Sequence, residues 1–351
     1  MKVQKKVTVF DVAKRAGVSH TAVSMALRGS PQIGAEQTKK ICALAEKLGY
    51  YPKAAAQMLR SGRTGYLGII MAGSSVDVVA EAGFGGLILA HFLGQCQSRS
   101  IRNSVEFFQP GQNGRFAPPH ILAGNLVDGV VLAGFVDAQL RDWLAKQSRY
   151  PWVSIDEPAP HSVLCSSDKG VAEAVHRLAT LGHRRIAFWG GPTCFNTHRL
   201  ELEGFRRAAA ESNMDICSEH WVKDPELPDA GFGAKDMAAW SHKLLSGHSR
   251  PTAFICHGPE CSREVIRSAA ALGLSVPKDL SIYCFGGAAD ALSNTPYLST
   301  IEVDFPSMVN EALSMLSSLL GTKRVPPRTE WFQPRIVDRE TVAAANPKIK
   351  D

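Results

Sequence analysis

The chain has 351 residues, 45% of them hydrophobic and 21% charged, with a net charge of +6. This balance is ordinary for a globular protein and excludes disordered and fibrous classes, and the length suggests two or three domains. No apolar run approaches the roughly 18–20 residues of a membrane span, and the N-terminus lacks the apolar core of an export signal. The eight cysteines are scattered without a Cys-x-x-Cys pair, as expected for reduced thiols; they are Cys42, Cys96, Cys165, Cys194, Cys217, Cys256, Cys261 and Cys284. We therefore expect a cytoplasmic protein with no membrane partner.

Positive charge is concentrated at the N-terminus. Residues 1–65 contain 12 Lys and Arg against 3 Asp and Glu, whereas the rest of the chain contains 27 against 30. A basic head on a slightly acidic body indicates that the head binds a polyanion such as nucleic acid.

The head begins with T-V-F-D-V-A-K-R-A-G-V-S-H-T-A-V-S-M-A-L-R, from Thr8 onwards. Thr8 and Asp11 have the spacing of a helix N-terminus, which predicts a helix over 9–16. Gly17 can make a tight turn and Ser19 can cap a second helix over 20–28. Two such helices form a helix-turn-helix, and a third helix over 35–48 completes a small core.

The second helix carries polar residues on its outer surface. In a helix-turn-helix the start of this helix enters the DNA major groove. We therefore expect His20 and Thr21 to meet base edges, while Arg28 and nearby hydroxyl groups contact phosphates. The alternative is that these residues are only the exposed face of a small helical bundle.

A fourth helix, a short one, is predicted over 53–60, after Pro52 and before Gly62. A helix of this length is marginal alone. Leu59 is unusual in a basic linker, and an apolar side chain on a helix that folds against DNA can wedge between base pairs in the minor groove. A plain linker remains the alternative.

The stretch from Thr8 to Gly68, including G-Y-Y-P-K-A-A-A-Q-M-L, resembles the headpiece and hinge of the LacI/GalR family of bacterial transcription regulators. The resemblance implies a homodimer that reads a pseudo-palindromic double-stranded DNA operator with one headpiece per half-site. It also implies that His20 and Thr21 read bases and that Leu59 is the minor-groove wedge. The expected DNA-binding residues are Thr8, Ser19, His20, Thr21, Ser24, Met25, Arg28, Ala56, Leu59 and Arg60.

The body alternates predicted strands with predicted helices. Strands are predicted at 66–71, 128–133 and 152–156, with helices over 84–98 and 137–147. The pattern then repeats, with helices over 169–181, 200–212 and 260–272 and strands within 181–192, 251–256 and 280–285. This alternation predicts an α/β fold, in which parallel sheets are covered by helices on both faces.

L-G-H-R-R-I-A-F-W-G-G-P and P-Y-L-S-T-I resemble the effector domain of the same family, a periplasmic-binding-protein-like pair of subdomains with a ligand cleft between them. The resemblance implies a headpiece over 1–52, a hinge over 53–65, an effector-binding and dimerisation domain over 66–342 and a tail over 343–351. Its N-subdomain is expected over about 66–161 and 291–323, and its C-subdomain over about 162–290 and 324–342.

The predicted cleft departs from the family. Asp156 matches a ligand-contacting aspartate, but Glu201 stands where many members have an arginine, and the nearest arginine is Arg199. Glu201 would favour a cationic or hydroxyl-rich ligand, whereas Arg199 would favour an acidic one. The effector could be a carbohydrate or a related metabolite, and a cleft that binds nothing is the further alternative. The expected effector-binding residues are Ser74, Asp156, Arg199, Glu201, Phe232, His257, Phe285 and Phe305, with the phenylalanines as apolar walls.

Enzymatic motifs are missing from the sequence. It has no phosphate-binding loop, no G-x-S-x-G elbow and no H-E-x-x-H helix, and its histidines are dispersed. We therefore expect no catalytic residue, no cofactor and no metal. A solute-binding protein of the periplasmic type and an effector-independent DNA binder are the alternatives. A sequence-specific repressor accounts for head, hinge and body together.

Overall fold

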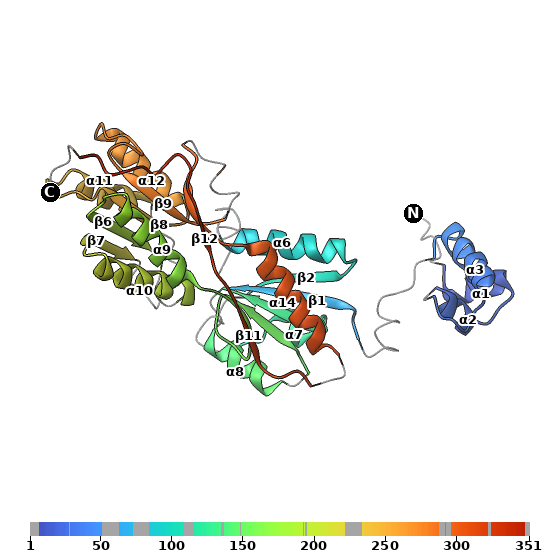
Figure 1. Cartoon of the computed structure of the whole chain (residues 1–351). Coiled ribbons are helices and arrows are strands. Elements are labelled where there is room, and N and C mark those ends of the chain that lie inside the picture. The colour runs from blue at the N-terminus through green and yellow to red at the C-terminus, as the bar shows by residue number, and fades with distance from the viewer. Residues whose placement is uncertain are drawn as a thin grey trace. The chain divides into compact units, whose positions relative to one another are not determined.

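The computed structural model of the protein describes residues 7–27, 29–50, 63–72, 84–108, 116–134, 137–147, 149–191, 193, 195–221, 234–287, 292, 296–321 and 324–347. The chain divides into two compact units, Met1–Thr64 and Gly65–Asp351 (Figure 1). Among the described residues, no helix is both long and apolar enough to cross a membrane.

The first unit contains the helices α1 (Val9–Ala16), α2 (His20–Ala26) and α3 (Ala35–Lys47). They enclose a small core, formed by Val12, Ala13, Val23, Ala26, Ile41 and Ala45. The predicted helix-turn-helix is confirmed, although α2 ends at Ala26, two residues earlier than expected. The helix predicted over 53–60 lies outside the described residues.

The second unit begins with a six-stranded parallel sheet, which with its helices we call the first lobe. Its strand order is β11-β5-β4-β3-β1-β2. The strands are β1 (Tyr66–Ala72), β2 (Arg102–Phe108), β3 (Gly129–Ala133), β4 (Trp152–Ile155), β5 (His161–Cys165) and β11 (Arg328–Phe332). Alternate side chains of β3 face opposite sides. Val131 packs into the core with α6 (Phe84–Ser98) and α14 (Phe305–Leu319), whereas Val130 packs with α7 (His120–Ala123) and α8 (Ala138–Lys146).

A second six-stranded sheet forms the second lobe, with the order β12-β10-β9-β8-β6-β7. Its strands are β6 (Arg185–Gly190), β7 (Asp215–Trp221), β8 (Ala253–His257), β9 (Ser281–Gly286), β10 (Ser299–Glu302) and β12 (Arg335–Val337), and β12 runs antiparallel to β10. Phe188 of β6 packs towards α9 (Ser167–Thr180) and α10 (Asn196–Glu211). Trp189, on the opposite face, packs towards α11 (Ala234–Leu245) and α12 (Gly258–Ala271).

The chain passes between the lobes at Ser166, at residues 303–304 and at residues 333–334. The predicted subdomain bounds, 66–161 with 291–323 and 162–290 with 324–342, are therefore wrong in three places. Strands β5 and β11 belong to the first sheet, and β10 belongs to the second. The error has a physical cause, because sheet membership depends on hydrogen bonds between distant segments. β11 pairs with β5, and Ser162 contacts Thr329 across 167 positions of sequence.

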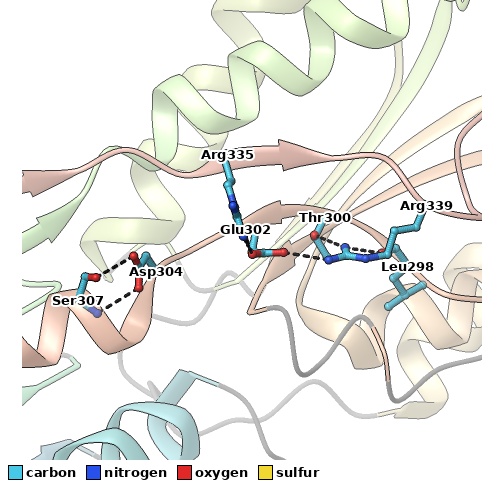
Figure 2. A network of polar contacts seen from close by, with 7 residues as sticks. All are labelled: Leu298, Thr300, Glu302, Asp304, Ser307, Arg335 and Arg339. Atoms are coloured by element: carbon cyan, nitrogen blue, oxygen red, sulfur yellow. Dashed lines mark hydrogen bonds and ion pairs between the residues drawn. The ribbon is translucent and has the colours of Figure 1, made fainter. Parts of the chain in front are cut away.

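Polar contacts hold these crossovers together. The amide of Ser166 donates to the carbonyl of Phe332 at 2.8 Å, joining two of them. At the end of β10, Glu302 accepts hydrogen bonds from Arg335 Nη2 at 2.5 Å and from Arg339 Nη2 at 2.9 Å (Figure 2). Asp304 then caps α14, where its Oδ1 accepts from the Ser307 amide at 3.0 Å.

Candidate functional site

The turn between α1 and α2 is built from local hydrogen bonds. Thr8 and Asp11 form a reciprocal capping box, in which Asp11 Oδ2 accepts from the Thr8 amide at 2.8 Å. Gly17 ends α1 with a φ of 67°, a left-handed conformation that favours glycine. Ser19 Oγ then accepts from the Ala22 amide at 3.1 Å and starts α2. Two of the predicted DNA-binding residues, Thr8 and Ser19, are thus the helix caps.

The outer surface of α2 carries the residues predicted to read DNA. His20 and Thr21 are exposed, whereas Ser24 and Met25 are half-buried. The exposed ring of Phe10, in α1, lies 5.1 Å from the ring of His20. The sequence prediction did not include Phe10, although an apolar side chain on the polar face of α1 was the available signal. Of the remaining predicted residues, Arg28, Ala56, Leu59 and Arg60 lie outside the described part of the chain.

A second set of polar residues lies where the two lobes meet. We call it the inter-lobe cluster. From the first lobe it takes the two residues that follow β4, and from the second lobe it takes residues of α10 and the end of β8. Its members are Asp156, Glu157, Asn196, Thr197, His198, Glu201 and His257.

Asp156 is buried and conformationally constrained. Only 6% of its surface is exposed, and its φ of 72° lies in the left-handed region. Its Oδ1 atom has no hydrogen-bond partner among the described residues. Burial, together with the negative charges of Glu157 and Glu201, raises the pKa of Asp156 to about 8. The Thr197 hydroxyl favours the ionised form, although it makes no hydrogen bond of standard geometry.

Glu157 connects the two lobes. Its Oε1 accepts a hydrogen bond from the backbone amide of Asn196, the first residue of α10, at 2.8 Å. Burial raises the pKa of Glu157, while this hydrogen bond and the charges of Arg199 and Arg141 lower it. Arg199 itself donates to Asn196 Oδ1 at 2.8 Å.

Glu201, His257 and His198 form a hydrogen-bonded row. The fully buried Glu201 carboxyl contacts His257 Nδ1 at 2.9 and 3.0 Å, and His257 Nε2 lies 3.0 Å from His198 Nε2. Burial raises the pKa of Glu201 to about 8 and lowers that of His257 to about 4. In the described residues, no group of three or more His, Cys, Asp or Glu side chains could hold a metal ion.

The remaining predicted effector residues divide into two groups. Phe285 is buried. Its ring is stacked with the ring of His257, and the two ring centroids lie 6.0 Å apart. Phe305 is also buried and packs against Phe84, and a Cβ placed on Gly287 would lie 3.3 Å from its ring. Both rings therefore belong to packed surroundings, and the ring of Phe285 lies beside the cluster. Ser74 and Phe232 lie outside the described residues.

Four members of the inter-lobe cluster were not predicted: Glu157, Asn196, Thr197 and His198. The sequence pattern predicts that this helix begins near residue 200, but α10 begins at Asn196. A start at 196 would have placed Asn196, Thr197 and His198 in the first turn, beside Glu201. The sequence carries no signal for Glu157, because its hydrogen bond is to a backbone amide 39 residues away.

Comparisons with known proteins agree with this architecture. Residues 8–53 match the family of bacterial regulatory proteins of the lacI type, and residues 175–342 match the periplasmic binding protein-like domain. The chain is 28% identical to the HTH-type transcriptional repressor PurR of Serratia proteamaculans (strain 568), covering 96% of this chain and 97% of that protein. PurR of Yersinia pestis bv. Antiqua (strain Antiqua) gives the same values.

Solved structures show the same fold. The lac repressor dimer bound to operator and the anti-inducer ONPF has a TM-score of 0.81 at 22% identity, covering 97% of this chain and all of that one. The complex of the transcriptional regulator CelR with cellobiose has a TM-score of 0.67 at 21% identity, over 96% and 100% of the two chains. Because residues 8–53 match the lacI family, residues 175–342 match the periplasmic binding protein-like domain and the similarity to PurR covers nearly the whole chain, the chain belongs to the LacI family of bacterial transcription regulators, DNA-binding proteins with a periplasmic-binding-protein-like effector domain rather than enzymes.

Proposed function

We propose that the protein is a repressor that binds a pseudo-palindromic operator as a homodimer and releases or tightens that binding when a small molecule occupies the inter-lobe cluster. The observation that carries the DNA-binding part is α2 itself. Its start, held by the Ser19 cap, exposes His20 and Thr21 next to each other. A helix presented in this way can enter a major groove and reach base edges.

The homodimer and the operator rest on the family and on the relatives. The solved lac repressor is a dimer bound to operator, and the PurR proteins are transcriptional repressors. We assign base reading to His20 and Thr21, with Met25 one turn further along α2. Ser24 and Arg28 are assigned to the phosphate backbone, and Leu59 to the minor groove with Ala56 and Arg60 beside it. The caps Thr8 and Ser19 present backbone and hydroxyl groups at the helix starts.

The effector site rests on buried polar groups that the protein leaves unpaired. Asp156 Oδ1, Asn196 Nδ2 and Thr197 Oγ1 are buried without a hydrogen-bond partner in the described part of the chain. Burial of an unpaired polar group typically costs about 1–3 kcal/mol, so a ligand that pairs with all three is favoured. We assign Arg199, Glu201 and His257 to the same site, with Phe285 and Phe305 as its apolar walls. Ser74 and Phe232 complete the proposed set.

The test of the DNA-binding function is selection of bound sequences from a random duplex library by the full-length protein at near-physiological salt. A recovered palindrome supports the dimeric repressor. Affinity for that palindrome should fall steeply with salt, with a log–log slope of roughly −0.9 for each phosphate neutralised. Recovery of bound DNA without any shared motif would overturn sequence-specific repression.

A matched pair of variants assigns the binding to α2. His20→Ala should lose discrimination at one or two operator positions, whereas Gln37→Ala, on the exposed surface of α3, should keep the wild-type motif. Equal loss in both variants would show that α2 does not carry the sequence readout.

A further inference from the structure

The N-terminus of α10 is capped from the other lobe. Phe195 stands at the N-cap position and makes no side-chain capping hydrogen bond. The acceptor for the first amide of the helix is instead Glu157 of the first lobe, at 2.8 Å from Asn196 N. Helix N-termini attract anions, because several amide groups there lack partners and the helix dipole is positive at this end. A carboxylate of the protein therefore occupies an anion position at the boundary between the lobes.

Positive charge reaches this position from both lobes. Arg199 of α10 and Arg141 of α8 both act on the Glu157 carboxylate and favour its ionised form, against the effect of burial. Arg199 is also held at the helix start by its hydrogen bond to Asn196 Oδ1. The surroundings of Glu157 are thus those of a bound anion: a helix N-terminus with a guanidinium group from each lobe.

The unpaired groups beside this position can all donate hydrogen bonds. Because the Arg199 guanidinium can only donate hydrogen bonds, its partner in Asn196 is the acceptor Oδ1. The amide NH2 group of Asn196, at Nδ2, then has no hydrogen-bond partner among the described residues. Asn196 is 3% exposed and Thr197 is 6% exposed. Asp156, also 6% exposed, is mostly protonated at neutral pH because burial raises its pKa to about 8, so it too can donate.

We propose that the effector of this protein carries a carboxylate or phosphate group that replaces the Glu157 carboxylate at the N-terminus of α10. The inference rests on the proposed function, because it names the chemical class of ligand for the same site. A cationic ligand would meet two arginines and a row of donors. A neutral ligand would not compete with Glu157 for the helix N-terminus and the two arginines. An anion pairs with the donors and releases Glu157, which breaks a hydrogen bond between the lobes and so couples binding to their arrangement.

The test uses the full-length protein in which the Glu157 side chain is replaced by that of alanine. Glu157→Ala should lower the melting temperature by about 2–4 °C through loss of the cap. Acetate carries the same carboxylate group that the Glu157→Ala variant lacks. Added acetate should therefore restore most of the lost melting temperature, and the effect should saturate as its concentration rises. Inorganic phosphate should do the same if the site accepts a phosphate group, and the lower half-saturating concentration identifies the preferred chemistry. Acetamide, which is neutral, should restore nothing.

Asp137→Ala provides the matched control. Asp137 caps α8 within the first lobe, where its Oδ1 accepts from the Leu140 amide at 2.9 Å. The loss of this cap should not be restored by acetate. The double variant Glu157→Ala/Arg199→Ala should lose the restoration that Glu157→Ala shows, because one of the two guanidinium groups is gone.

Equal effects of acetate on the Glu157→Ala and Asp137→Ala variants, or no effect on either, would overturn the proposal. If Glu157→Ala does not fold, Glu157→Gln keeps the side-chain volume, and acetate should raise its melting temperature more than that of the wild type. Failure of that difference would again overturn the anion site. Operator selection is measured separately, so an intact operator motif without anion restoration would refute the ligand class and leave the repressor function standing.

Discussion

The carboxyl group of Glu201 and the imidazole of His257 lie 2.9 Å apart, with Glu201 fully buried. Burial raises the pKa of Glu201 to about 8 and lowers that of His257 to about 4. Between these values the pair therefore holds one proton, whichever of the two residues carries it. The neighbouring Asp156, whose pKa burial raises to about 8, holds a second proton over the same range.

We predict that the protein loses stability as the pH rises from about 6.5 to 8. In the unfolded chain, the ordinary pKa values are 3.8 for Asp156, 4.5 for Glu201 and 6.5 for His257. Above pH 6.5 the unfolded chain has therefore released both the proton of Asp156 and the proton of the Glu201–His257 pair. The folded protein retains them until about pH 8. Since the folded state binds more protons, its free energy of unfolding falls by up to about 1.4 kcal/mol per pH unit for each proton. Urea denaturation at pH 6, 7 and 8 measures this slope.

Two single variants separate the contributions of Asp156 and Glu201 to this pH dependence. Asp156→Asn and Glu201→Gln each remove one titrating carboxyl, so each should reduce the slope by about half. Glu203→Gln is the control on the same helix, because the Glu203 side chain is 58% exposed and pairs only weakly with Arg199 at 4.0 Å. It should leave the slope unchanged. A wild-type stability that is flat from pH 6.5 to 8 would contradict the assignment of these protons.

In the headpiece, the second prediction concerns Phe10 and His20. The rings lie 5.1 Å apart, and we expect this contact to restrict the orientation of His20 on the surface of α2. His20→Ala should cost roughly 1–3 kcal/mol at one or two operator positions and spare the others. Phe10→Ala should weaken discrimination at the same positions, and it should add little in the His20→Ala background if it acts through His20. Binding to single-base operator variants measures both effects, and uniform weakening on every sequence would show that His20 does not read bases.

Local signals explain why part of this molecule could be predicted from its sequence. The α1–α2 turn depends on Thr8, Asp11, Gly17 and Ser19, whose partners all lie within a few residues, and the predicted turn is present. The start of α10 has no such signal, since its cap is Glu157 of the other lobe. The helix was therefore predicted to begin too late, and most of the inter-lobe cluster was missed.

The crossovers could not be predicted for the same physical reason. Whether a short strand joins the first or the second sheet depends on its pairing, as for β11 with β5. Its own residues, Arg328–Phe332, contain no preference between the two sheets.

A third prediction concerns the network in Figure 2. Glu302 is 7% exposed and accepts hydrogen bonds from two arginines. Burial alone would raise its pKa, but Arg335 and Arg339 together lower it. Glu302→Gln removes the charge and leaves the Arg339 side chain, which is 16% exposed, without its anion. We expect a loss of about 3 kcal/mol in the free energy of unfolding. Arg335→Ala should cost less than about 1 kcal/mol, because the Arg335 side chain is 76% exposed. Equal losses in the two variants would show that Glu302 contributes no more than a surface pair.

The last prediction compares two glycines inside helices. Gly204, in α10, lies against the backbone of Asp168 in α9, and a Cβ at this position would collide with the Asp168 carbonyl oxygen and Cα. Backbone atoms cannot rotate away as a side chain can, so Gly204→Ala should force the helices apart and cost about 1–3 kcal/mol. Gly94, in α6, has no atom within 4 Å of the corresponding Cβ position. Gly94→Ala should therefore stabilise the protein by up to about 1 kcal/mol, since alanine favours a helix over glycine. Chemical denaturation of the two variants in parallel gives the signs, and a Gly204→Ala protein as stable as Gly94→Ala would mean that α9 and α10 are not in the close contact described here.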